Sequence, residues 1–138
     1  MEARTTVYKS IKTGTYYVQP YTIGPVAATW FGEPTVIGPA EFSAKIADAV
    51  ITNLEKFGKD KFDAAKAIRF SPREQRDFYE QHIEVSIHKP SSGGVIIFPL
   101  RRDGGGRVAD EEDAIILADA DLRDKLPDAI SDALSRAT

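Results

Sequence analysis

Two histidines are the first residues in this chain whose chemistry could serve catalysis or metal binding. His82 and His88 lie six residues apart in the alternating stretch HIEVSIH. On a β-strand both side chains point to the same face but lie roughly 20 Å apart, which is too far for them to share one metal ion. The pattern therefore predicts exposed strand histidines and no metal site.

A dense acidic run, DEED at Asp110–Asp113, follows the glycine-rich stretch DGGGR that begins at Asp103. Hard cations need carboxylates from several segments, whereas neighbouring carboxylates mostly point apart. No Lys-Ser/Thr follows the glycines, so a phosphate-binding loop is not indicated. The chain also lacks cysteine and the G-x-S-x-G pattern. We therefore expect no catalytic residue, cofactor or metal, although two carboxylates that meet only in space would leave no pattern in the sequence.

Charge is distributed unevenly along the 138 residues, whose net charge is −3. Residues 56–102 carry ten Lys/Arg and six Asp/Glu, a local +4, and residues 103–138 carry ten Asp/Glu and four Lys/Arg, a local −6. The acidic third would repel a phosphate backbone, so direct nucleic-acid binding is not expected. An acidic surface suits a basic protein partner, although solvated helix faces would explain the same distribution.

The stretch WFGEP, Trp30 to Pro34, holds the only tryptophan in the chain. An aromatic pair beside a carboxylate, in a stretch punctuated by Gly and Pro, is typical of an interface anchor. A place in the core is the alternative, because aromatic side chains usually bury. The candidate partner-binding residues are Trp30, Phe31, Glu33, Asp103, Asp110, Glu111, Glu112 and Asp113.

The elements that must position these residues indicate one α+β domain over residues 1–138. Alternation and turn residues predict strands at 5–9, 16–21, 26–31, 35–37, 82–88, 95–102 and 114–117. Helical spacing predicts helices at 39–58 and 119–137, with Pro127 as a kink or a restart in the second. The capping box SPRE at Ser71–Glu74 starts a helix to Gln81. A weaker helical turn is expected in 59–70 and a flexible loop in 103–113.

Two stretches of the chain resemble each other and suggest that the fold consists of two halves. GTYYVQP at 14–20 matches GGVIIFP at 93–99 with an offset of 79 residues, and 35–54 matches 115–134 with an offset of 80. The second match contains five identities in twenty pairs. The pattern predicts two β-β-β-α half-repeats that share a largely antiparallel sheet with helices packed on it, unless any two such units would look equally alike.

The order of these patterns resembles a known family. An early VY strand is followed by YYVQPY, EFSAKIADAVITNL, IEVSIH, VIIFPLRRDGGG, DAIIL and a terminal LRDKLPDAISDAL helix. This arrangement resembles small bacterial immunity proteins that protect cells against toxins of contact-dependent growth inhibition systems. The resemblance implies a non-enzymatic cytoplasmic protein, and the lack of an apolar run of 18 residues predicts no membrane segment. It would bind one cognate toxin domain, often a nuclease, in a 1:1 complex and block its active site.

Two other functions fit the composition. One is a small enzyme with an unrecognised carboxylate site. The other is an adaptor that forms a homo-oligomer through an exposed sheet edge. The family has no fixed set of binding residues, so the candidate interface rests on the aromatic pair and the acidic residues named above.

Overall fold

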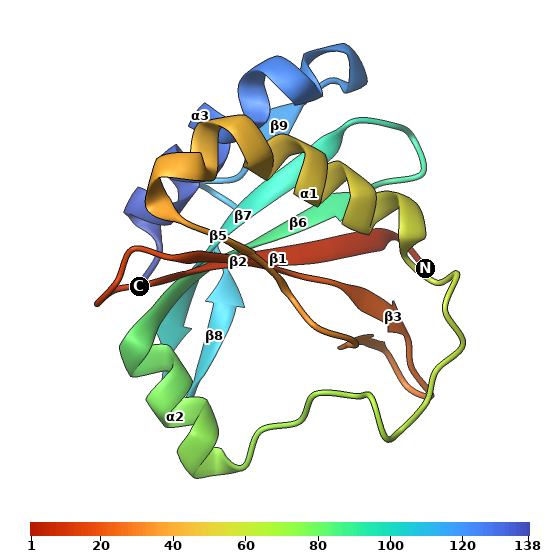
Figure 1. Cartoon of the computed structure of the whole chain (residues 1–138), viewed down its shortest axis with the longest axis vertical. Helices are drawn as coiled ribbons and strands as arrows, with labels where there is room; N and C mark the ends of the chain where they lie inside the picture. Colours follow the sequence, from red (N-terminus) through yellow and green to blue (C-terminus); the bar gives the residue numbers. More distant parts are fainter.

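A curved antiparallel sheet with two long helices on one face forms the frame of the molecule (Figure 1). The computed structural model describes all residues 1–138. The strands are β1 (Ala3–Ser10), β2 (Tyr16–Gln19), β3 (Tyr21–Ile23), β4 (Ala28–Trp30), β5 (Thr35–Ile37), β6 (His82–Lys89), β7 (Val95–Asp103), β8 (Gly106–Ala109) and β9 (Ile115–Leu117). The helices are α1 (Phe42–Lys56), α2 (Pro72–Gln81) and α3 (Leu122–Arg136). The predicted α+β class is confirmed.

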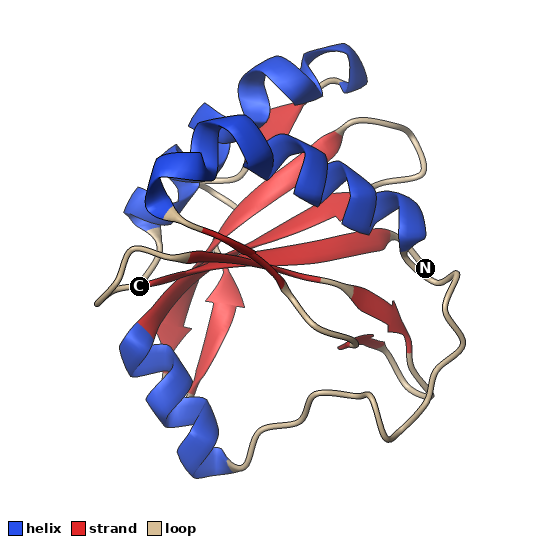
Figure 2. Cartoon of the chain, in the orientation of Figure 1, coloured by secondary structure: helices blue, strands red, loops and turns tan.

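All strand pairs are antiparallel. The order is β5-β2-β1-β6-β7-β8, and β9 pairs with another part of β7, while β3 and β4 form a separate hairpin. Figure 2 shows α1 and α3 on one face of the sheet, and α2 with the β3–β4 hairpin on the other side. None of the helices combines the length and the apolar character that crossing a bilayer requires.

The two predicted half-repeats are present in the strand registers. Tyr16 pairs with Ile37 in the first half, and Val95 pairs with Leu117 in the second. A proline in each half, Pro20 directly after β2 and Pro99 within β7, accepts an equivalent hydrogen bond at its carbonyl oxygen. Phe31 N–H donates to Pro20 at 3.0 Å, and Asp110 N–H donates to Pro99 at 2.9 Å. Because Thr6 pairs with its own equivalent, Ser86, an approximate two-fold axis passes between β1 and β6.

The core has the same symmetry. Of its 19 buried residues, 16 form eight pairs that are 79 or 80 positions apart: Val7/Ile87, Tyr16/Val95, Val18/Ile97, Ile37/Leu117, Phe42/Leu122, Ile46/Leu126, Val50/Ile130 and Leu54/Leu134. These side chains lie between the sheet and helices α1 and α3. The periodicity of the two helices thus places one apolar stripe from each half against the same layer of strands.

The structure confirms several predicted boundaries and corrects others. Helix α2 covers residues 72–81 behind a complete Ser71 capping box, as predicted. Residues 59–70 contain turns but no helix. The strand predicted at 16–21 is interrupted at Pro20, which has no N–H for a ladder. Helix α3 continues through Pro127 as one helix.

The stretch 103–113 is not entirely a loop, because its residues Gly106–Ala109 form β8. Asp103 pairs with Gly106, so Gly104 and Gly105 form a two-residue turn, and the φ of Gly104 is +63°. Such turns need positive φ, which glycine adopts without strain. The run of glycines therefore marks a tight hairpin.

Candidate functional site

An aromatic hollow lies on the sheet face opposite α1 and α3. Its volume is about 240 Å³ and its walls include Trp30 from β4, Phe70, and Phe78 and Tyr79 from α2. The Trp30 ring meets Phe70 and Phe78 edge-on, with ring centroids 5.8 and 5.6 Å apart. The capping box fixes where α2 begins, and Phe78 and Tyr79 of this helix line the hollow. Trp30 is thereby brought beside aromatic residues about 40 or more positions later in the sequence.

The hollow has a buried ion pair at its floor. Arg107 Nη1 of β8 donates to Glu84 Oε1 of β6 at 3.0 Å, and their side chains are only 2% and 6% exposed. The Arg107 guanidinium also lies over the Tyr79 ring, 4.5 Å from its centroid. Burial raises the pKa of Glu84, although the hydrogen bond from Arg107 acts in the opposite direction.

Three further N–H groups of Arg107 are directed to backbone carbonyls. Nη2 donates to Tyr79 O at 3.0 Å and to His82 O, and Nε donates to Thr138 O at 3.1 Å. These bonds tie β8, the end of α2 and the end of the chain together. Arg107 is therefore committed to holding the fold around the hollow.

The predicted exposed histidines are not on an open face. His82 is partly buried, stacks on Phe78 with centroids 4.5 Å apart, and its Nδ1 lies 3.1 Å from Phe78 O. His88 is also partly buried, and its Nε2 lies 2.8 Å from Ser86 Oγ. Burial lowers the pKa of both imidazoles. The prediction failed because α2 and the aromatic residues cover the face that alternation assigned to solvent.

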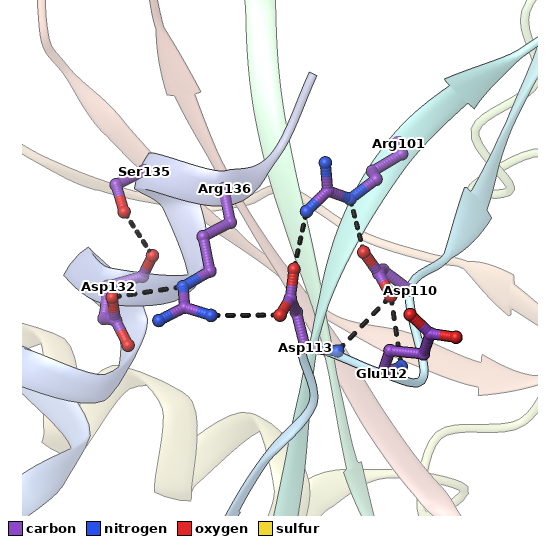
Figure 3. Close-up of polar contacts among 7 residues, drawn as sticks. All are labelled: Arg101, Asp110, Glu112, Asp113, Asp132, Ser135 and Arg136. Atoms are coloured by element: carbon purple, nitrogen blue, oxygen red, sulfur yellow. Dashed lines mark hydrogen bonds and ion pairs between the residues drawn. The ribbon is translucent and has the colours of Figure 1, made fainter.

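The acidic residues form a second candidate site, shown in Figure 3. Arg101 binds both Asp110 and Asp113, with Nη2 to Asp113 Oδ2 at 2.6 Å. Arg136 of α3 binds the other oxygen of Asp113 at 3.0 Å. Asp110 Oδ1 accepts the N–H groups of Glu112 and Asp113 at 3.1 and 3.3 Å. We call residues 110–113 the acidic loop.

These contacts give the acidic loop a fixed shape. Burial acts to raise the pKa of Asp110, but the hydrogen bonds from the Asp113 amide and Arg101 hold it below its ordinary value. The side chains of Glu111 and Glu112 are exposed and form no ion pair. Two carboxylates thus organise the loop, and two remain free for solvent or a partner.

The structure separates the other candidate residues into different environments. Trp30 lines the hollow and its indole N–H donates to Tyr21 OH at 2.6 Å. Phe31 is buried, with its ring centroid 6.4 Å from that of Phe62. Glu33 and Asp103 are exposed. The eight candidates therefore do not form a single cluster.

The two candidate stretches are nevertheless equivalent within the fold. Trp30 pairs with Tyr21 in the first half, as Ala109 pairs with Leu100 in the second. The residue after each, Phe31 or Asp110, donates its N–H to the carbonyl oxygen of Pro20 or Pro99. The stretch beginning at Trp30 in one half corresponds to the stretch beginning at Ala109 in the other. One carries aromatic side chains and the other carries the acidic loop.

Sequence reasoning missed Tyr79, Glu84 and Arg107. One signal was available: Glu84 lies in an alternating strand directly after a helix that contains Phe78 and Tyr79. The aromatic residues of such a helix need a surface that buries them, and the strand that follows directly can provide it. Nothing in the local sequence identified Arg107 as the partner of Glu84, because 23 positions separate them.

Comparison with known proteins places the fold but not the activity. No family model matches the chain, and no curated protein matches it in sequence. Among solved structures, the chain is similar to a protein of unknown function from Neisseria meningitidis, with a TM-score of 0.74 and 14% identity. The match covers 100% of this chain and 96% of that one. The same architecture thus occurs as a whole in a protein of very different sequence.

Proposed function

We propose that this chain is an immunity protein that acts in the cytoplasm. It binds the cognate toxin domain of a contact-dependent growth inhibition system, a basic nuclease, in a 1:1 complex and occludes its active site. The proposal starts from the resemblance of the sequence pattern to this family. It is supported by one observation above all: the acidic loop is held in one shape by Arg101 and Arg136 while Glu111 and Glu112 remain exposed and unpaired.

The physical reason is complementarity between the loop and a nucleic-acid-binding cleft. A nuclease that binds a phosphate backbone needs a cationic surface. Carboxylates held in fixed positions can occupy that surface without a large ordering cost, and their field accelerates association. Asp103 and Glu33 add exposed negative charge elsewhere on the surface.

The test uses the toxin domain encoded next to this chain's gene and measures two things: whether this chain protects cells from the toxin domain, and whether it binds the toxin domain. Cells that express the toxin domain should grow only when this chain is present, and the purified proteins should form a 1:1 complex. Growth arrest despite expression of this chain, together with no complex, would overturn the proposal. Hydrolysis of a substrate by this chain alone would instead favour the alternative that the protein is an enzyme.

Two double charge-reversal variants, one in the acidic loop and one on α3, test where the toxin domain binds. Glu111→Lys with Glu112→Lys should slow association at least about tenfold and weaken its salt dependence, because exposed charges act mainly on the encounter rate. Asp124→Lys with Asp128→Lys makes the same change of charge at exposed positions of α3 and should leave the rate close to that of the wild type. Equal association rates for the two variants would place the contact elsewhere.

A further inference from the structure

The aromatic hollow contains an unused hydrogen-bond acceptor. Glu84 has only 5% of its surface exposed, and its Oε1 accepts from Arg107. Its second oxygen, Oε2, makes no hydrogen bond within the protein, and Glu84 lines the hollow. A ligand in the hollow that donates an N–H to this oxygen would form a charge-assisted hydrogen bond.

Arg107 leaves Oε2 without a donor, because its other engaged N–H groups are directed to three carbonyl oxygens. Nearly all N–H groups of Arg107 are engaged, so it offers little to an anionic ligand. An anion in the hollow would also meet the carboxylate of Glu84. The free oxygen therefore favours a ligand that carries N–H donors.

The walls fit such a ligand as well. Trp30, Phe70, Phe78 and Tyr79 line the hollow, and Phe70 is 42% exposed at its mouth. Aromatic faces attract cations, most strongly where water is excluded, and they also pack against an alkyl chain. A carboxylate behind aromatic walls is a suitable arrangement for an alkylammonium group.

We infer that the aromatic hollow, through Glu84 Oε2 and its aromatic walls, binds the alkylammonium group of a lysine side chain presented by a protein partner. The assignment of that lysine to the toxin domain rests on the proposed function. The acidic loop supports it, because Asp110 follows β8, the strand that carries Arg107. One basic partner can therefore contact the loop and fill the hollow.

The first experiment needs no partner. Butylammonium chloride is titrated into the full chain, with Trp30 fluorescence as the signal, because Trp30 is the only tryptophan and lines the hollow. Butan-1-ol and sodium butyrate are titrated in parallel as uncharged and anionic probes of similar size. We expect saturable binding of butylammonium that is at least about tenfold tighter than binding of either control probe. Equal responses to the three probes would overturn the inference.

Two variants test the named groups. Glu84→Gln keeps an acceptor for Arg107 but removes the charge, and Phe70→Leu removes an aromatic face at the mouth. Each should weaken butylammonium binding about tenfold. Phe62→Leu, the same substitution outside the lining of the hollow, should have no effect. If Glu84→Gln is poorly folded, Phe70→Leu decides alone, and unchanged binding in Phe70→Leu contradicts the inference.

The toxin domain then separates this inference from the proposed function. If the toxin domain binds and Phe70→Leu weakens its binding about tenfold while Phe62→Leu does not, the hollow receives a toxin side chain. Toxin binding that Phe70→Leu leaves unchanged would overturn the inference and leave the proposed function intact. Butylammonium binding without any toxin complex would overturn the proposed function and keep the cation site.

Discussion

At the scale of single residues, Arg107 contributes most to holding the structure around the hollow. It connects β8 to Glu84, to the carbonyls of Tyr79 and His82 and to Thr138, and only 2% of its side chain is exposed. A buried ion pair gains little over an apolar pair, but the loss of one partner leaves an uncompensated buried charge. The structure therefore depends on Arg107 more than a surface salt bridge would suggest.

Replacing Arg107 with alanine should destabilise the protein by about 3–5 kcal/mol, because Glu84 would remain buried without its partner. Arg102→Ala is the matched control: Arg102 is exposed and forms no ion pair, so its loss should cost less than about 1 kcal/mol. Urea unfolding followed by circular dichroism measures both. A similar cost for the two variants would show that the buried pair is not important for stability.

Ionisation of Tyr8 makes the stability of the protein depend on pH in a measurable way. Burial, with smaller contributions from Tyr17 and Glu84, raises the pKa of Tyr8 from its ordinary 10.0 to about 12. The folded state therefore holds the phenol proton more tightly than the unfolded state does. The resulting stabilisation is complete below pH 10 and is lost as the pH rises toward about 12.

Tyr8→Phe tests this sign. Between pH 10 and 12 the free energy of unfolding of the wild type should fall more steeply than that of the variant, which cannot ionise at position 8. Urea unfolding at several pH values in this window gives both curves. Parallel curves would show that Tyr8 titrates alike in the folded and unfolded states.

At the scale of elements, the two halves place different side chains at equivalent positions between helix and strand. In the first half, Asn53 Nδ2 of α1 donates to Thr5 Oγ1 of β1 at 3.2 Å and to Val18 O at 3.3 Å. Their equivalents 80 residues later, Ala133 and Val85, are apolar core residues. A buried polar pair in one half thus corresponds to an apolar pair in the other.

This correspondence predicts coupling between Thr5 and Asn53. Asn53→Ala or Thr5→Val alone should cost about 1–3 kcal/mol, because each leaves a buried polar group with fewer partners. The double variant, which copies the second half, should cost less than the sum of the two by about 0.5–3 kcal/mol. A double-mutant cycle in urea measures the difference. Strict additivity would mean that the two side chains act independently.

At the scale of the whole molecule, both faces of the sheet use the same strands. Val7, Val85 and Ile87 pack into the core beneath α1 and α3. Of their neighbours on β1 and β6, Tyr8 stacks on Trp30 and Glu84 lines the hollow. The layer of helices and the aromatic layer are therefore not independent. Disruption of one removes the strands on which the other packs.

We therefore expect a single cooperative unfolding transition. Trp30 fluorescence reports the aromatic layer and far-ultraviolet circular dichroism reports mainly the helices, so the two signals should give the same midpoint in urea. An earlier fluorescence transition would show that the β3–β4 hairpin and α2 separate before the core unfolds. That outcome would also mean that the hollow opens at little cost.

The exposed edges of the sheet also concern the whole molecule, because they could join it to other chains. Val36 of β5 and Ile116 of β9 are equivalent residues at the two sides of the sheet, 61% and 75% exposed. Edge strands with exposed β-branched residues can pair with other chains, and β5 and β9 have only three residues each. The adaptor alternative would require pairing at such an edge, which the mass of the protein in solution would reveal.

The sequence by itself determined the class of fold, most of the elements and the half-repeat. These depend on local signals: alternation in HIEVSIH, helical spacing in 39–58 and 119–137, the Ser71 capping box and the offsets of 79 and 80. Local signals are reliable when one element buries one face. The weaker helical turn expected in 59–70 appears only as non-helical turns, and the loop expected over all of 103–113 is partly β8, because tertiary pairing and turn geometry decide such short stretches.

Only the tertiary structure decided where the candidate site residues lie. Alternation distinguishes the two faces of β6 but does not show that α2 covers the second face and buries Glu84. The acidic run shows negative charge but not that Arg101 and Arg136 take up Asp110 and Asp113 and leave Glu111 and Glu112 free. The physical reason is that burial and ion pairing depend on distances between side chains, and these become defined only when segments far apart in the sequence pack together.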